Sequence, residues 1–160
     1  MTAGISDNTL NLKANITTDR DIKAYNDLIT LGYLNDSWAK EYFDACEEEI
    51  LGDLETAIIN DIKKPSVVGL PEVFGQLTIY NSSKVLEQMD ALKKVFNSYN
   101  EWMINIISLK DGKSYIITFS EKSKQDLEKL FNLRFNYDIL ALDKFMLRKE
   151  IIKKASESEE

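Results

Sequence analysis

The stretch "WMINIISLKDGKSYIITF", residues 102–119, contains two apolar segments on either side of a short polar turn. Residues 102–109 and 114–119 are rich in isoleucine and aromatic residues, which favour β-strands. Asp111 and Gly112 lie between them, and this pair tolerates the positive φ angles that a tight hairpin turn requires. The stretch therefore predicts an antiparallel β-hairpin.

Upstream of the hairpin, the clearest helix signal covers residues 17–32. Thr17 or Thr18 can cap the N-terminus, and Asp21 follows Thr18 at the spacing of a capping box. Gly32 can end the helix. The apolar residues at helical spacing, which should form the buried face, are Ile22, Tyr25, Leu28 and Ile29.

A second helix is predicted over residues 36–52, with Asp36 or Ser37 as its N-cap. Cys46 occurs at the spacing of the apolar residues of this helix, so we interpret it as a core residue rather than a nucleophile. The residues that share this spacing are Ala39, Phe43, Cys46 and Ile50. A third, shorter helix is predicted from Asp53 to about residue 60.

The same signals predict the other elements around the hairpin. They are a strand over residues 72–80, a long helix from Ser82 or Ser83 to Phe96, a helix over residues 121–131 capped by Ser120, a strand within residues 141–146, and a last helix from about Arg148. Both prolines lie within residues 63–75, which predicts the main irregular connection there. The sequence therefore predicts an α/β fold with a small mixed β-sheet of about five strands flanked by helices.

The composition is that of an ordinary folded chain, with 160 residues of which 44% are hydrophobic and 29% charged. No apolar run approaches the roughly 18 residues that span a bilayer, so we expect no membrane partner. The net charge of -7 disfavours nucleic acid as a partner, because an acidic surface repels the phosphate backbone. Cys46 is the only cysteine and no signal peptide is evident, so the sequence predicts a cytoplasmic location.

Histidine is absent from the sequence, and this excludes several kinds of active site. Without an imidazole there is no Ser-His or Cys-His nucleophile system, and a single cysteine cannot build a thiolate zinc site. A site of carboxylates for a hard cation is still possible. We interpret the acidic runs at residues 47–49 and 157–160 more simply, as the solvated face of a helix and a charged tail.

Positive charge is concentrated near the C-terminus of this acidic sequence. The basic residues there are Lys144, Arg148, Lys149, Lys153 and Lys154. Arg148 and Lys149 stand near the predicted start of the last helix, where free N–H groups and the helix dipole favour a phosphate. Lys153 and Lys154 can instead complement the C-terminal dipole of the same helix.

The segment "AGISDNTLNLKANITTDRD", residues 3–21, resembles the segment that joins the two domains of the Asp-His-His (DHH) phosphoesterases. The similarity is to the group of manganese-dependent inorganic pyrophosphatases, exopolyphosphatases and prune. Further segments resemble that group in the same order. Asp61–Lys63 matches its Asp-x-Lys motif, and residues 71–83 match the strand and helix cap that follow. Residues 102–120 match its hairpin, and residues 144–155 match its closing Ser-Arg-Lys-Lys-Gln or Arg-Lys-Gln motif. The resemblance covers nearly the whole chain and is to the C-terminal DHH-associated domain.

This resemblance implies a domain that grips substrate phosphates while an N-terminal DHH domain, acting in cis or in trans, holds the metals. By position it assigns substrate binding to Lys63, Arg148 and Lys149, and it assigns no catalytic residue to this chain. It implies Mn²⁺ or Mg²⁺ in the complete enzyme, none bound by this chain alone, and pyrophosphate or polyphosphate as the substrate. The isolated chain is predicted to be inactive.

The resemblance also implies a domain organisation. Residues 1–16 would be the remnant of a linker from an absent N-terminal DHH metal domain. Residues 17–155 would form the substrate-binding domain, and residues 156–160 would be a charged tail.

The sequence departs from the family pattern at several positions. Asn8 aligns with an aspartate that is a metal ligand in the family, so either Asp7, one position earlier, takes that role or the position has lost its charge. The closing motif has Leu147 where serine is usual and Glu150 where lysine or glutamine is usual. Pyrophosphatase, exopolyphosphatase-like and prune-like identities therefore all stay open.

Two other hypotheses are compatible with the sequence. The first is a non-catalytic interaction or regulatory module that retains the fold, which Asn8 and Glu150 favour. Lys63, Arg148 and Lys149 favour the phosphohydrolase domain instead. The second is an unrelated small α/β domain whose basic helix is only a solvated surface.

Overall fold

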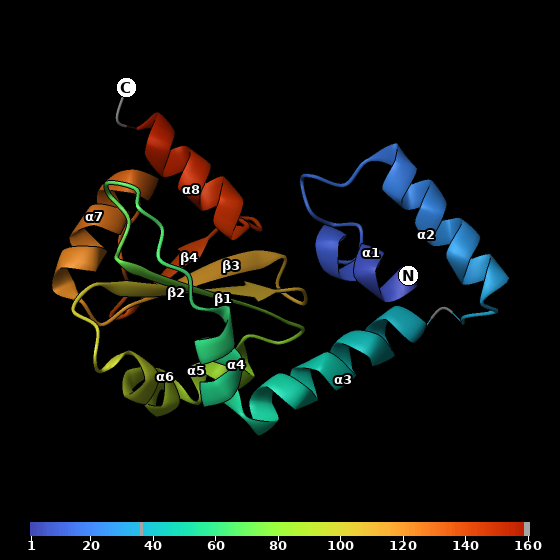
Figure 1. Cartoon of the computed structure of the whole chain (residues 1–160), viewed down its shortest axis with the longest axis horizontal. Helices are drawn as coiled ribbons and strands as arrows, with labels where there is room; N and C mark the ends of the chain where they lie inside the picture. The colour runs from blue at the N-terminus through green and yellow to red at the C-terminus, as the bar shows by residue number, and fades with distance from the viewer. Residues whose placement is uncertain (36, 159–160) are drawn as a thin grey trace. The chain divides into compact units, whose positions relative to one another are not determined.

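The computed structural model describes residues 1–35 and 37–158. The chain divides into two compact units, Met1–Glu49 and Ile50–Glu160. Figure 1 shows that the first unit consists of helices, whereas the second contains a sheet with helices. The predicted linker (residues 1–16), substrate-binding domain (residues 17–155) and charged tail (residues 156–160) concern the organisation of a longer protein. These limits stay predictions.

The first unit contains α1 (Thr2–Thr9), α2 (Asp19–Leu31) and most of α3 (Trp38–Gly52). The predicted capping box of α2 is confirmed, because Thr18 N–H donates to Asp21 Oδ2 at 2.9 Å and Asp21 N–H donates to Thr18 Oγ1 at 3.3 Å. The hydrogen bonds from Thr18 hold the pKa of Asp21 below its ordinary value.

The predicted buried face of α2 is only partly correct. No residue along α2, all of which the structure describes, is buried, and Ile22 is 40% exposed. Tyr25, Leu28 and Ile29 are half-buried. A unit of 49 residues buries a small fraction of its surface, so its apolar helix faces stay partly in contact with solvent.

In α3, the acidic run at residues 47–49 differs from its prediction. Glu48 and Glu49 are exposed as expected, but Glu47 is buried, with 2% of its surface exposed. Phe43 precedes Glu47 by four residues and is also buried, so one helical turn places both on the same face. Cys46 is half-buried. Asp36, one of the two predicted caps, lies outside the described residues.

The second unit is built on a mixed sheet in the order β1-β2-β3-β4. β1 (Val73–Ile79) pairs in parallel with β2 (Trp102–Ser108), and β3 (Lys113–Ile117) pairs antiparallel with both β2 and β4 (Ile139–Leu142). The predicted hairpin is confirmed, with Gly112 at a φ of 67° in the turn. The α/β prediction is confirmed as well, with four strands in the described sheet rather than about five.

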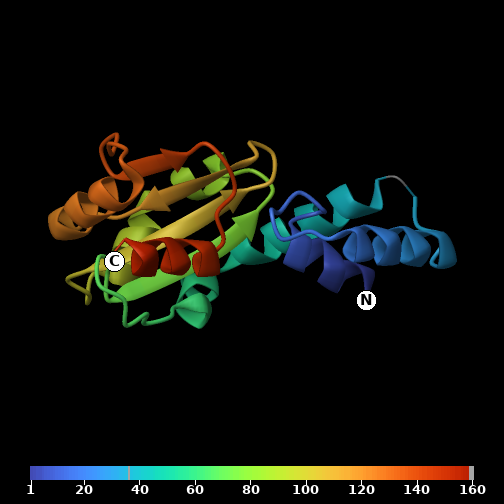
Figure 2. The ribbon, with the colours of Figure 1, turned by 90° about the horizontal axis from the view of Figure 1, so that it is seen from above.

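Helices cover both faces of this sheet. Figure 1 shows the sheet nearly edge-on between α4 (Leu54–Asp61), α5 (Ser83–Leu86) and α6 (Met89–Phe96) on one side, and α7 (Glu121–Phe131) and α8 (Arg148–Glu157) on the other. Figure 2, the view from above, places α8 over the strands. None of the described helices is both long enough and apolar enough to cross a membrane.

Each face has its own hydrophobic core, because strand residues alternate between the faces. The cluster beneath α4–α6 contains Ile58, Val85, Leu92, Phe96, Trp102, Ile104 and Ile106, and the cluster beneath α7 and α8 contains Phe74, Met103, Ile116, Leu127, Leu140 and Ile151. Every residue of β2 is buried. The central strand therefore joins the two cores.

Two predicted element boundaries are wrong. The long helix from Ser82 or Ser83 to Phe96 is two helices, because the backbone of Gln88 leaves the helical region with φ -108° and ψ 33°. Its N–H bonds three residues back, to Val85 O at 2.9 Å, which forms a tight turn between them. The strand predicted within residues 141–146 ends at Leu142, and the following residues form the loop that leads to α8.

A carboxylate at the hairpin fixes one end of the sheet. Asp111 Oδ2 accepts hydrogen bonds from Ser108 Oγ at 2.7 Å, Ser82 Oγ at 2.8 Å and Tyr115 OH at 3.2 Å. The bond from Ser108 is the largest cause that holds the pKa of Asp111 below its ordinary value. Asp111 therefore joins the β2–β3 turn to the segment that precedes α5.

Replacing Asp111 by Asn should destabilise the chain by about 1 kcal/mol at neutral pH, after allowance for the exposure of this carboxylate. Because its pKa is lowered in the folded state, the contribution is complete above about pH 5 and is lost as the pH falls through the lowered pKa. Urea unfolding of both proteins from about pH 7 to pH 2 measures the difference. A difference that stays constant at acid pH would contradict this role of the charge.

Candidate functional site

The two segments that carry the predicted phosphate-binding residues come together at the edge of the sheet. After α4 ends at Asp61, Lys63 pairs with the edge strand β1: its N–H donates to Phe74 O at 3.0 Å and its carbonyl accepts from Phe74 N–H at 2.8 Å. Arg148 is the first residue of α8. The Arg148 guanidinium lies over the Phe74 ring, 5.3 Å from its centroid.

Arg148, Asp61 and Gln76 form a closed ring of hydrogen bonds. Arg148 Nη2 donates to the carboxylate Oδ2 of Asp61 and, at 3.0 Å, to its backbone oxygen. Asp61 Oδ2 also accepts from Gln76 N–H at 2.6 Å, and Gln76 Oε1 accepts from Arg148 N–H at 2.6 Å. The ring joins the end of α4, strand β1 and the start of α8.

Polar residues within the sheet extend this network beneath the loop that precedes α8. Asn105 Nδ2 donates to Gln76 Oε1 at 3.2 Å and to Met146 O at 2.7 Å. Met146 N–H donates to Ser114 Oγ at 3.0 Å. Asn105 and Ser114 are fully buried. The backbone from Met146 to Arg148 is therefore anchored by side chains from three strands, and the start of α8 cannot shift without breaking these bonds.

The first N–H groups of α8 already have internal acceptors. Leu147 N–H donates to Glu150 Oε2 at 2.8 Å, Arg148 N–H donates to Gln76, and Glu150 N–H donates to Leu147 O at 2.9 Å. The helix start predicted at Arg148 is confirmed. The backbone donors that a phosphate would use there are largely occupied, so side chains must provide most of any binding.

The three residues predicted to bind phosphate differ in whether their charge is paired with a carboxylate. The Arg148 side chain is 16% exposed and is paired with Asp61. Lys63 and Lys149 are both exposed, and neither ammonium group pairs with any residue that the structure describes. These two lysines therefore carry the unpaired positive charge of the segments that meet here.

The neighbouring lysines are engaged elsewhere. Lys64 pairs with Glu72 at 3.4 Å and lies 5.8 Å from the centroid of the Tyr99 ring. Lys153 pairs with Glu157 at 3.6 Å in the same helix. Lys153 is thus part of the exposed surface of α8, and its predicted interaction with the C-terminal dipole of this helix stays a prediction.

Asp7, the predicted metal ligand, lies in α1 and is exposed. Its Oδ2 accepts a hydrogen bond from Tyr42 OH at 2.7 Å, and Asn8 is exposed beside it. Burial, followed by the bond to Asp7, raises the pKa of Tyr42. The residues that the structure describes contain no group of three or more aspartate, glutamate or cysteine side chains arranged to hold a metal. Asp7 therefore stands alone among the described residues as a candidate ligand, and its role as a metal ligand stays a prediction.

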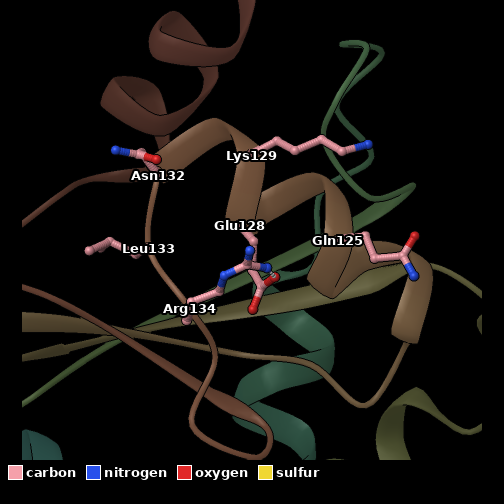
Figure 3. Close-up of a pocket in the computed structure, with 6 residues that line it drawn as sticks. All are labelled: Gln125, Glu128, Lys129, Asn132, Leu133 and Arg134. Carbon is pink, nitrogen blue, oxygen red and sulfur yellow. Dashed lines mark hydrogen bonds and ion pairs between the residues drawn. The ribbon is translucent and has the colours of Figure 1, made fainter.

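A surface pocket at the C-terminal end of α7 is a separate feature. Figure 3 shows its lining residues, with Arg134 turned toward Glu128, and its volume is about 400 Å³. Glu128 accepts from Phe135 N–H at 2.8 Å and from Arg134 Nη1 at 2.6 Å. The bond from Phe135 is the largest cause that holds the pKa of Glu128 below its ordinary value, and the bond from Arg134 is the next. Glu128 and Arg134 thus neutralise each other, and the bond from Phe135 ties the segment that follows α7 to the end of this helix.

Comparison with solved structures identifies a similar fold. The crystal structure of a Methanococcus jannaschii protein described as a "putative family II inorganic pyrophosphatase" superposes with a TM-score of 0.75 and 21% sequence identity. The alignment covers 96% of this chain and 54% of that chain. This chain shares the fold of about half of that protein. The predicted resemblance to this group of phosphoesterases is thus confirmed as a likeness of fold.

Two other comparisons do not extend this likeness beyond the fold. No family model matches the sequence, and no curated protein matches it. The chain spans about half the length of the similar structure, so the activity of the whole protein is not transferred with the fold.

Sequence reasoning missed the residues that hold Arg148 in place. Asp61 was part of the Asp-x-Lys motif, but only Lys63 of that motif received a role. Gln76 and Asn105 lie within the predicted strands and have no predicted role. Their polar side chains within otherwise apolar strands are a signal, because a buried amide needs partners inside the protein.

Asp61 and Arg148 should be energetically coupled in their contribution to the stability of the chain. Asp61→Asn and Arg148→Met should each destabilise the chain, and the double variant should lose less than the sum by about 1–2 kcal/mol, because each single change leaves a partly buried charge without its partner. Urea unfolding of the four proteins measures this.

The matched control is the exposed pair of Lys153 and Glu157 in the same helix, as Lys153→Met and Glu157→Gln. Its coupling should be close to zero, because exposed ion pairs contribute little. Additive effects at Asp61 and Arg148 would show that the pair does not hold α8 to α4.

Proposed function

We propose that residues 17–155 form the phosphate-gripping domain of a metal-dependent hydrolase that acts on phosphoanhydrides, either inorganic pyrophosphate or polyphosphate. One observation supports this most directly: the Asp61–Lys63 segment and the Arg148–Lys149 segment lie together, since Arg148 bonds to Asp61. The resemblance in sequence assigns phosphate binding to the same two segments. The likeness of fold to a pyrophosphatase structure adds support.

In this proposal Lys63 and Lys149 contact the substrate phosphates, and Arg148 contributes through donors that Asp61 does not use. These cations neutralise the charge that moves to the leaving phosphate. Mn²⁺ or Mg²⁺, when bound by the N-terminal DHH domain in cis or in trans, would polarise the phosphoryl oxygens and activate a water. Asp7 would add at most one ligand to that metal. The isolated chain would bind phosphate without turning it over.

The alternative is a non-catalytic interaction or regulatory module. The occupied backbone donors of α8 and the pairing of Arg148 with Asp61 favour it, because both reduce the number of groups available to an anion. The exposed, unpaired lysines favour the hydrolase domain. Neither candidate requires nucleic acid or a membrane as a partner, and a cytoplasmic location stays a prediction.

Lys149→Ala should weaken pyrophosphate binding by about tenfold, because it removes one charge-assisted hydrogen bond worth about 1.5 kcal/mol. Lys63→Ala should have a similar effect. An NMR titration of the isolated chain, which follows backbone amides near Lys63 and Lys149, measures both the affinity and the location of binding.

Lys153→Ala is the matched control, since it removes one exposed lysine from the same helix and should change the affinity less than twofold. Equal losses of pyrophosphate affinity in Lys149→Ala and Lys153→Ala would show that the anion is attracted only non-specifically by positive charge. The absence of saturable shifts at millimolar ligand would favour the interaction module.

A further inference from the structure

Glu150 places a negative charge at the start of α8, within the segment proposed to bind phosphate. Its Oε2 accepts from Leu147 N–H at 2.8 Å, so its carboxylate lies at the helix N-terminus. Lys149 is the preceding residue and Arg148 the one before it. A carboxylate favours this position for the same reason as a phosphate does, because both are attracted by free N–H groups and the helix dipole.

Asp61 adds a second carboxylate to the same region, in contact with Arg148. The segments that meet here thus carry three basic side chains, Lys63, Arg148 and Lys149, and two acidic ones, Asp61 and Glu150. The local excess of positive charge is small. Coulomb energy scales with the charge of the ligand, so each carboxylate opposes a highly charged anion more strongly than a weakly charged one.

We propose that Glu150 is a specificity-determining residue of this site: its carboxylate lowers the affinity for phosphate ligands in proportion to their charge. The inference rests on the proposed phosphate-binding function and adds a selection among phosphate compounds. Orthophosphate, with the lowest charge, is affected least. Pyrophosphate and tripolyphosphate are affected progressively more, unless a cation bound to them reduces their charge.

Glu150 is the better of the two carboxylates for a test. Asp61 closes the ring with Gln76 and Arg148, so its replacement changes the position of Arg148 together with the charge. Glu150 caps α8 by accepting a hydrogen bond from Leu147 N–H, and glutamine can accept the same bond without carrying the charge. Glu150→Gln therefore separates the electrostatic role from the structural one.

Glu157→Gln is the matched control. It makes the same change of net charge in the same helix, but at the last residue of α8 instead of the first turn. Glu157 is exposed and pairs only weakly with Lys153, at 3.6 Å. Any gain in anion binding from the overall charge of the chain would occur equally in both variants, whereas a local effect would occur in Glu150→Gln alone.

The experiment is an NMR titration of the whole chain and of both variants with orthophosphate, pyrophosphate and tripolyphosphate, without divalent cations and at one ionic strength. Glu150→Gln should tighten pyrophosphate binding about fivefold and tripolyphosphate binding more, with less than a twofold change for orthophosphate. Glu157→Gln should change each affinity less than twofold. The Leu147 amide resonance, preserved in Glu150→Gln, verifies that the helix cap is intact.

The results separate this inference from the function on which it rests. Anion binding that is equal in Glu150→Gln and Glu157→Gln, or a gain that does not grow with ligand charge, overturns the role of Glu150 and leaves the phosphate site in place. An absence of saturable binding by every variant with every ligand overturns both. Binding of pyrophosphate only by Glu150→Gln would support the inference in its strongest form.

Discussion

The ion pair between Asp61 and Arg148 is the interaction on which the arrangement of the candidate site depends. It joins residues 87 positions apart, and Gln76 completes the ring from the edge of β1. Without it, the end of α4 and the start of α8 would meet only through the strand between them. Because Lys63 follows Asp61 by two residues and Lys149 follows Arg148 directly, the pair also brings two exposed lysines into one region.

The same ion pair has two opposing effects on anion binding. It fixes Arg148 and so limits the conformational entropy that a ligand must remove on binding. It also neutralises part of the charge that would attract the ligand. The ammonium groups of Lys63 and Lys149 have no such partner among the described residues, so no carboxylate there offsets their charge. The candidate site thus combines a paired Arg148 with two exposed lysines.

Local features were the ones that the sequence could predict. The Thr18–Asp21 capping box, the turn at Gly112 and the Ser120 cap of α7 each depend on residues only a few positions apart, and each is confirmed. The break at Gln88 was missed because Val85, Leu92 and Phe96 keep a helical spacing across it. Periodicity reports which residues face the core, and two short helices on one face give the same pattern as one long helix.

The contacts around Arg148 could not be predicted because they join distant parts of the chain. The basic cluster and the family resemblance identified Arg148 and Lys149, but neither contained information on which acceptors surround them. Gln76 and Asn105 become meaningful only when the register of β1 and β2 places them opposite each other. Roles for single residues therefore required the three-dimensional structure, although the fold class did not.

The distribution of charge bears on whether the fold has kept a phosphate-binding role. The chain has 27 acidic and 20 basic residues, and several exposed lysines, among them Lys40, Lys94 and Lys122, are each paired with a carboxylate. Lys63 and Lys149 are unpaired with any described residue, yet their segments are held together by a partly buried ion pair. The charges of these two lysines are therefore not offset by a carboxylate of the described residues, which suits an anion-binding role. Glu150 would limit how much negative charge such an anion can carry.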